Sequence, residues 1–144
     1  MPAQNYANHR RLVPMFHFVL FPLLFVTFIG SLVNVYKSLG DHQRLYSASL
    51  IVALTVAMLF LLVFCRIFSL MAQDRAIRAE ENLRHFALTG KLLDPRLTIR
   101  QVIGLRFAPD DEFVELAKKA AGGNLSEDEI KKSIKNWKPD TYRA

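Results

Sequence analysis

The sequence predicts an all-α membrane protein. The expected architecture is a two-helix transmembrane hairpin whose second helix extends into the cytoplasm, followed by a small domain of three short helices. Two observations carry this prediction. The chain of 144 residues has two long runs without Asp, Glu, Lys or Arg, from Leu12 to Tyr36 and from Leu45 to Cys65. The sequence after Gly90 is instead rich in helix breakers and capping residues.

Both charge-free runs are long enough to cross a bilayer. As helices of 25 and 21 residues, they would extend about 37 and 31 Å, against a hydrocarbon core of about 30 Å. If they were core helices of a soluble protein, too little amphipathic sequence would remain to cover them. A cleaved signal peptide has an apolar region of only about 7 to 15 residues. We therefore predict transmembrane helices over 12–36 and 45–65, joined by an external loop over 37–44.

Basic residues near the two runs predict the orientation. Arg10 and Arg11 precede the first run, and four arginines follow the second between Arg66 and Arg84, whereas the loop holds two basic residues. Because basic residues mark the cytoplasmic side, both termini are expected there. Residues 1–11 are predicted to form an interfacial arm. Arg10, Arg11 and Arg66 are expected to contact anionic lipid headgroups.

Small residues predict where the two membrane helices touch. Ser49, Ala53 and Ala57 recur at every fourth position, which lets another helix approach closely. The matching residues near the outer end of the first helix are Thr27, Gly30, Ser31 and Asn34. An antiparallel hairpin places both sets at similar depth, so we predict that they pack together. Contact with another subunit is the alternative.

Two prolines fall within the first run. Pro14 lies near its start and Pro22 near its middle, and an interior proline removes one backbone hydrogen bond. A bend near Phe18 is therefore predicted.

The second membrane helix is expected to continue over 66–89. No helix breaker occurs between Cys65 and Gly90, and oppositely charged residues spaced four apart support a solvated helix. These pairs are Asp74 with Arg78, Glu80 with Arg84, and Glu81 with His85. Apolar residues in this stretch have roughly heptad spacing, but charged residues interrupt it. A long coiled coil is therefore not expected.

Residues 90–144 are predicted to form three short helices. Thr98 with Gln101, and Ser126 with Glu129, have the spacing of capping boxes, which begin the first and third helices. The first helix is expected to end near residue 107.

The second helix is expected to begin at Pro109 and to end at Gly122 and Gly123. The third is expected to carry Ile130, Ile134 and Trp137 on one face. A unit of some 55 residues is marginally stable alone, so docking on the 66–89 helix or on a partner is expected.

No catalytic, metal or cofactor site is predicted. The single cysteine, Cys65, excludes a disulfide within the chain; juxtamembrane palmitoylation is an alternative to a plain packing role. His17 could serve as a haem or proton-relay residue with a partner chain, or could be interfacial or helix-bonded. Consecutive carboxylates over 110–112 suit a helix N-terminus.

The net charge of +6 does not indicate a nucleic-acid-binding protein by itself. The excess is +3 over residues 1–44 and +3 over residues 66–144, so neither part is a basic block. The predicted partner surface consists of Lys131, Lys132, Lys135 and Trp137. Together with Lys138 these lysines could bind phosphate, but their placement also suits the dipole of the last helix.

Several short segments carry a resemblance to a known family. They are Gln4-Asn5-Tyr6 with Asn8-His9, Pro14 with His17-Phe18, Gln73-Asp74-Arg75 with Ile77-Arg78, Leu105-Arg106-Phe107-Ala108, Glu129-Ile130-Lys131-Lys132 with Ile134-Lys135-Asn136-Trp137, and Pro139-Asp140. On these segments the chain resembles a bacterial family of small membrane proteins of unknown function. The resemblance covers nearly the whole chain and implies two helices in a bacterial inner membrane. It implies no activity, cofactor or catalytic residue.

Three functions are compatible with this sequence. The first is a non-enzymatic, membrane-anchored interaction or scaffold protein that binds its own kind or another membrane protein. The second is an accessory subunit of a transporter or respiratory complex, with His17 or Asn34 contributing to a shared site. The third is a membrane-tethered nucleic-acid binder that uses the lysines of the last helix.

Overall fold

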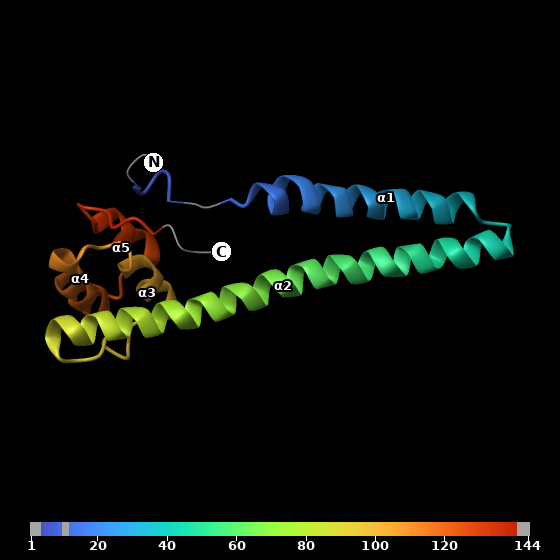
Figure 1. The fold of residues 1–144 in the computed structure, drawn as a ribbon. Coiled ribbons are helices and arrows are strands. Elements are labelled where there is room, and N and C mark those ends of the chain that lie inside the picture. Colours follow the sequence, from blue (N-terminus) through green and yellow to red (C-terminus); the bar gives the residue numbers. More distant parts are fainter. Residues whose placement is uncertain (1–3, 10–11, 141–144) are drawn as a thin grey trace. The chain divides into compact units, whose positions relative to one another are not determined.

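The computed structural model describes residues 4–9 and 12–140, and every regular element in this part of the chain is helical (Figure 1). The elements are the π-helix η1 (Met15–Leu20), α1 (Phe21–Lys37), α2 (His42–Thr89), α3 (Ile99–Leu105), α4 (Asp110–Gly123) and α5 (Glu127–Ser133). The chain forms two compact units, Arg11–Ser69 and Met1–Arg10 with Leu70–Ala144. The all-helical prediction is confirmed, and α2 is one continuous helix of 48 residues.

The first long helix begins with a wide turn. The π-helix η1 ends where the Phe21 N–H donates to the Phe16 carbonyl, five residues back. Pro22 follows directly and has no N–H to donate. Pro22 thus accounts for a missing hydrogen bond at the point where the backbone widens. This π-helix occupies the position where the sequence predicts a bend, and a π-turn is a common cause of one.

A tight turn connects α1 to α2. Gly40 has φ +97°, a conformation that side-chain-bearing residues rarely adopt. Asp41 then caps the start of α2, because its carboxylate accepts a hydrogen bond from the Arg44 N–H at 3.1 Å. The turn therefore follows from a glycine and a capping aspartate in adjacent positions.

The contact between α1 and the first part of α2 repeats every three and four residues alternately. The buried and half-buried positions include Leu24, Phe28, Ser31, Val35 and Ser38 on and after α1, and Leu45, Ala48, Val52, Thr55, Leu59, Leu62 and Arg66 on α2. The Ser31 and Thr55 hydroxyl oxygens lie 3.3 Å apart across this contact. An average spacing of 3.5 residues is that of left-handed, coiled-coil-like packing.

This contact differs from the expected stripe of small residues. Of the seven residues expected to pack the two helices together, only Ser31 is buried. The six exposed ones are Thr27, Gly30, Asn34, Ser49, Ala53 and Ala57. For α2 the expectation assumed a strict four-residue repeat, whereas a 3.5-residue repeat turns the contacting face of α2 toward Ala48 and Thr55 instead.

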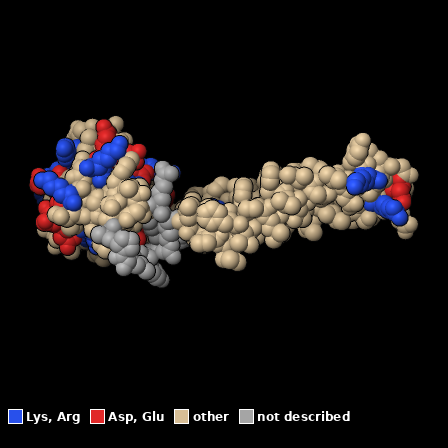
Figure 2. Space-filling view, turned by 90° about the horizontal axis from the view of Figure 1, so that it is seen from above, with Lys and Arg blue, Asp and Glu red and all other residues tan. Residues whose placement is uncertain are grey.

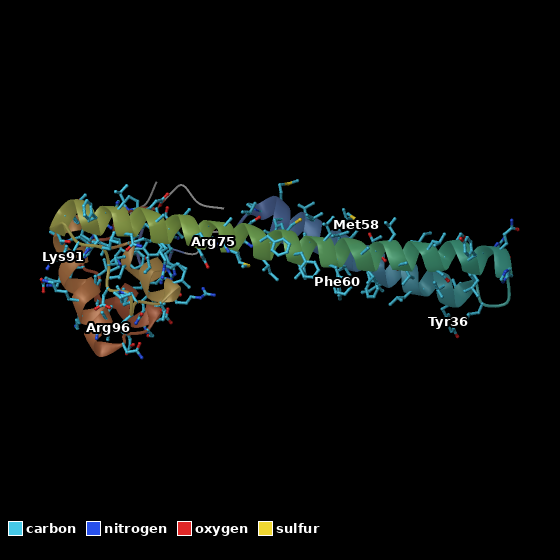
Figure 3. All side chains as sticks on the ribbon, turned by 90° about the horizontal axis from the view of Figure 1, so that it is seen from below. Tyr36, Met58, Phe60, Arg75, Lys91 and Arg96 are labelled. Atoms are coloured by element: carbon cyan, nitrogen blue, oxygen red, sulfur yellow. The ribbon has the colours of Figure 1, made fainter. Side chains whose placement is uncertain are left out.

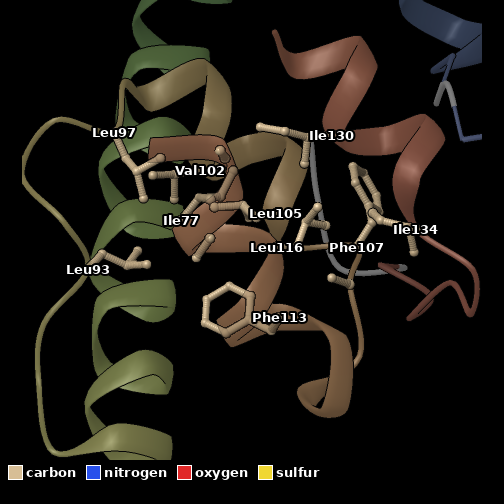
Figure 4. Packing of buried hydrophobic residues seen from close by; sticks show 13 residues of the cluster. Ile77, Leu93, Leu97, Val102, Leu105, Phe107, Phe113, Leu116, Ile130 and Ile134 are labelled. Atoms are coloured by element: carbon tan, nitrogen blue, oxygen red, sulfur yellow. The ribbon is translucent and has the colours of Figure 1, made fainter. Parts of the chain in front are cut away.

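A second core joins α3, α4 and α5 to the later part of α2 (Figure 4). Phe107 and Phe113 are fully buried in it, and Ile77 contributes from α2. Both predicted capping boxes are confirmed, since Thr98 with Gln101 and Ser126 with Glu129 each form the two reciprocal hydrogen bonds.

The ends of α4 and α5 correct the sequence-based expectations. Both Gly122 and Gly123 are helical, and the left-handed residue that ends α4 is Asn124, with φ 47°. Asparagine tolerates this conformation better than most residues. The helix α5 ends at Ser133, because Ile134 is extended. Ile134 and Trp137 therefore lie beyond α5, although Ile134 is still buried in the core.

Two glycine-to-alanine substitutions are expected to have opposite effects on stability. A Cβ at Gly104 on α3 would lie 3.1 Å from the Ile130 Cγ2 and 3.2 Å from the Glu127 carbonyl oxygen, so α5 must shift. A Cβ at Gly122 meets nothing within 4 Å. We expect Gly122→Ala to raise the unfolding free energy by about 0.5–1 kcal/mol through helix propensity. We expect Gly104→Ala to lower it by about 1 kcal/mol, the low end of overpacking costs.

Urea unfolding of the full chain in detergent micelles, followed by Trp137 fluorescence, measures both free energies. Equal stabilisation by the two alanines would show that α3 and α5 do not pack as closely as described.

Candidate interaction sites

Arg84 fixes the C-terminal helices to α2. Its guanidinium donates hydrogen bonds to Glu81 at 3.1 Å, to Asp110 at 2.7 Å and to the Ala108 carbonyl at 2.7 Å. The same group lies 4.3 Å from the centroid of the Phe113 ring. One side chain therefore joins α2 to the α3–α4 turn and the start of α4.

Burial makes Glu81 unusual among the carboxylates. Its side chain is 9% exposed and that of its partner Arg84 is 12% exposed. Desolvation raises the pKa of Glu81, and the Arg84 hydrogen bond opposes that rise. A carboxyl with a raised pKa can be a proton donor. Here the carboxyl is enclosed and forms an ion pair with Arg84.

The charged pairs expected along residues 66–89 do not form. Within the described residues, none of the three pairs spaced four apart is an ion pair. Arg78 instead donates to the Leu97 carbonyl at 2.7 Å, and His85 lies 2.6 Å from the Lys91 carbonyl. These polar residues therefore bind the backbone of the segment that follows α2, and they do not pair with one another.

Residues 4–9 pack on the C-terminal helical domain. The Asp140 N–H donates to the Gln4 side-chain oxygen at 2.7 Å. The Lys132 ammonium lies 5.4 Å from the Tyr6 ring centroid. The His9 ring contacts those of Phe107 and Trp137 at centroid distances of 5.9 and 5.7 Å.

A polar cavity of about 570 Å³ lies beside this N-terminal segment. The lining residues are Tyr6, Ala7, His9, Glu127, Asp128 and Lys131. Lys131 is buried, and its ammonium donates to Glu127 and to His9 Nε2 at 3.3 Å. The ammonium charge is thus compensated within the chain.

A second, mostly apolar groove of about 280 Å³ lies between α2 and α3. Met71 and Ile99 provide its apolar wall, and Asp74, Arg75 and Arg78 its charged rim. The Arg78 guanidinium is held by the Leu97 carbonyl. The groove therefore offers a small apolar surface next to two exposed arginines, Arg75 and Arg78.

The predicted partner surface is only partly exposed. Lys132 and Lys135 are exposed, whereas Trp137 is half-buried and its ring lies tilted against that of Phe107, at 5.0 Å between centroids. Lys131 is buried, which corrects its placement on a free surface. Burial of its ammonium over the Phe107 ring, at 5.6 Å, explains the difference.

Arg66 and His17 lie in the described part of the first compact unit. Arg10 and Arg11 lie outside the described residues, and Arg66 is half-buried, 5.9 Å from the Phe16 ring centroid. His17 Nδ1 lies 3.0 Å from the Val13 carbonyl oxygen, so the histidine is bonded to its own helix. No group of three or more potential metal ligands occurs in residues 4–9 and 12–140.

Glu112 organises the chain after α5, and its sequence context does not show this. Its carboxylate accepts hydrogen bonds from the N–H groups of Lys135 and Asn136 at 2.9 and 3.0 Å and from the Asn136 amide at 3.2 Å. These bonds begin where α5 ends. The sequence indicated only a helix N-terminal charge, because a partner 23 residues away leaves no local pattern.

Glu112→Gln is expected to destabilise the domain in a pH-dependent way. The hydrogen bond from the Lys135 backbone is the main cause that lowers the pKa of Glu112 below its ordinary value of 4.5. Its stabilising effect is therefore full above pH 4.5 and is lost as pH falls through the lowered pKa. At neutral pH we expect a loss of about 1 kcal/mol, discounted for solvent exposure.

Urea unfolding of wild type and Glu112→Gln at neutral pH and near pH 3 measures this difference. A gap that stays constant across the range, or widens in acid, would contradict the assigned role of the carboxylate.

These observations define an all-helical protein with two helices that are long and apolar enough to cross a membrane. The chain belongs to the family described as "Family of unknown function (DUF6526)", whose model matches residues 1–144. No curated protein and no solved structure shows significant similarity to the chain.

Proposed function

We propose that this protein is a non-enzymatic, membrane-anchored interaction protein of a bacterial inner membrane. Its two long helices cross the bilayer, and its C-terminal helices form a cytoplasmic docking domain. The single observation that carries this proposal is the exposure of two long apolar helices. Of the most apolar 18-residue stretch, only 6% is buried in the first helix and 17% in α2.

That exposure argues against a soluble protein. A core helix of a soluble protein is mostly buried, whereas residues such as Phe21, Leu54 and Phe60 are 51%, 63% and 60% exposed. Figure 2 shows charged side chains at the 37–44 turn and on the C-terminal helices, while the visible surface of α1 and of the first part of α2 is almost entirely uncharged. Lipid is the solvent that such a surface requires.

The packing of residues 4–9 supports an even number of membrane crossings. Gln4 and His9 contact residues of the 107–140 segment. The two apolar helices lie between these segments in the sequence, so the chain leaves one compact unit and returns to it. Two crossings satisfy this condition, and the surplus of basic residues around the unit favours the cytoplasmic side for both termini.

Isolation of the full chain from native membranes in mild detergent tests this function. We expect a self-associated species or a stable complex with another membrane protein, identified by mass spectrometry after cross-linking in the membrane. A monomer with no cross-linked partner in the membrane would contradict it.

An accessory subunit of a larger membrane complex is the second candidate. Asn34 favours it, because this polar residue is exposed on α1 near its outer end, where a neighbouring helix could satisfy its amide. His17 lends less support, since its ring bonds to its own helix. Replacement of Asn34 by Leu should then reduce recovery of the partner complex, and unchanged recovery would argue against this role.

Nucleic-acid binding has less support than either membrane role. Lys131 is buried and paired with Glu127, so Lys132, Lys135 and Lys138 remain as the exposed lysines of the expected basic surface. Three lysines close to the carboxylates of α5 provide little of the phosphate neutralisation on which such binding depends.

A further inference from the structure

An exposed apolar stripe runs along the part of α2 that follows the charge-free run. Its members are spaced four, three, four and three residues apart, and they are Ala72, Ala76, Ala79, Leu83 and Phe86. All five are exposed, with Leu83 at 68% and Phe86 at 52%. We call this set the α2 stripe.

The chain's own C-terminal domain does not cover the α2 stripe. The domain packs on α2 through Ile77, Glu81 and Arg84, which are buried or half-buried. At 100° per residue, these positions lie on the other side of the helix from the stripe. Figure 3 shows the side chains along α2, with Arg75 labelled within the 72–86 stretch.

Lipid does not cover the far end of the stripe either. Leu83 lies 18 residues after Cys65, or about 27 Å along the helix axis. The polar headgroup layer on each side of a bilayer is only about 5–8 Å thick. Leu83 and Phe86 would therefore face water, which disfavours large apolar side chains.

We propose that the α2 stripe packs against the α2 stripe of a second copy of this chain, in a parallel pair. Heptad spacing with alanine at three of five positions allows two helices to approach closely. This inference rests on the proposed membrane anchoring, because two copies inserted the same way hold their α2 helices parallel. Confinement to the membrane also raises the effective concentration, which a contact of about two heptads needs.

Charge complementarity favours a second copy of this chain as the partner, in a parallel orientation. Arg75 and Glu80 flank the stripe, and neither takes part in an ion pair within the described residues. In a parallel coiled coil, a residue beside the core of one helix faces a residue beside the core of the partner helix, five positions further along the sequence. Arg75 and Glu80 are five positions apart, so the pair forms two symmetric ion pairs between copies.

Disulfide cross-linking in native membranes tests the pairing in the full chain. In a Cys65→Ser background, oxidation of Ala72→Cys is expected to give a covalent dimer of twice 16.5 kDa. Lys119→Cys, an exposed position on α4, is the control and is expected to stay monomeric. Residue 72 lies at one end of the stripe, so an antiparallel pair would separate the two cysteines by about 20 Å.

Second substitutions then test the contact itself. Leu83→Glu added to Ala72→Cys should lower the cross-linked fraction about tenfold, as a weakening of 1.4 kcal/mol would do. Arg75→Glu should lower it as well, and Arg75→Glu with Glu80→Arg should restore it. The pairing is overturned if Ala72→Cys stays monomeric, if it cross-links to a different protein, or if the charge exchange fails to restore the dimer.

Alkaline extraction of the same membranes distinguishes an error in the proposed dimer from an error in the proposed membrane anchoring. A chain that resists extraction but does not cross-link through residue 72 overturns only the dimer. A chain released by alkali overturns the membrane anchoring on which the dimer depends.

Discussion

Arginine at both Leu54 and Leu61 is expected to prevent stable membrane insertion of α2. Both leucines are exposed, at 63% and 55%, and both lie within the charge-free run. An arginine in place of leucine near the centre of a membrane helix costs about 3–4 kcal/mol. Two such changes would cost up to about 6–8 kcal/mol, since Leu61 lies nearer the end of the run than Leu54, and alkaline extraction of membranes would then release the double variant.

The matched control carries the same two changes at Leu88 and Leu92. These leucines are also exposed, at 44% and 65%, but they lie outside the charge-free run. The control is expected to stay in the membrane fraction. If the long helices were instead the surface of a soluble protein, each exposed substitution would cost within about 0.5 kcal/mol and the two double variants would behave alike.

Arg84→Met is expected to be the most destabilising change in the C-terminal domain. It would leave the Glu81 carboxylate, 9% exposed, without its cationic partner. Loss of one member of a buried ion pair costs about 3–5 kcal/mol. Thermal unfolding of the full chain in detergent, followed by Trp137 fluorescence, measures the loss.

Two controls isolate the cause. Arg96→Met removes an ion pair in which the arginine side chain is 70% exposed, and it is expected to leave the unfolding temperature nearly unchanged. Adding Glu81→Gln to Arg84→Met removes the uncompensated charge and should recover part of the loss.

The loss of stability caused by Arg84→Met is expected to increase with pH. Desolvation already raises the pKa of Glu81, and loss of Arg84 would raise it further. Protonation in acid neutralises the buried carboxyl, so the defect should be smallest below the unfolded-state pKa of about 4.5 and grow as pH rises. A defect that grows in acid would show that Arg84 acts through another contact.

Local sequence signals predicted the fold well where the physics is local. The capping boxes at Thr98 and Ser126 and the start of α4 after Pro109 depend on residues within four positions of each other. The all-helical class also followed from residue types alone. Long charge-free runs, and short segments separated by helix breakers, adopt few structures other than helices.

Contacts between distant residues could not be predicted in the same way. The Glu112 carboxylate accepts hydrogen bonds from the backbone N–H groups of Lys135 and Asn136, just after the point where α5 ends. Gln4 and His9 pack on residues more than 90 positions away. A single sequence carries no periodicity or capping pattern that reports such pairs.

The helix contacts show a third kind of difference. Small residues at Ser49, Ala53 and Ala57 suggested a four-residue repeat, whereas the buried positions Ala48 and Thr55 follow a 3.5-residue repeat. In a membrane helix nearly every residue is apolar, so composition does not distinguish the face that meets a helix from the face that meets lipid. Charged residues that interrupt the apolar pattern after residue 66, such as Glu81 and Arg84, proved to hold the C-terminal domain in place.

Thiol labelling with a membrane-impermeant reagent tests the central claim most directly. In a Cys65→Ser background, single cysteines at Ala7, Leu39 and Lys119 report the N-terminal segment, the turn between α1 and α2, and the C-terminal domain. In intact cells, only Leu39→Cys is expected to react, and the other two should react after the membrane is permeabilised. Reaction of Ala7→Cys and Lys119→Cys on opposite sides of the membrane, or recovery of the chain in the soluble fraction, would contradict a hairpin with both ends in the cytoplasm.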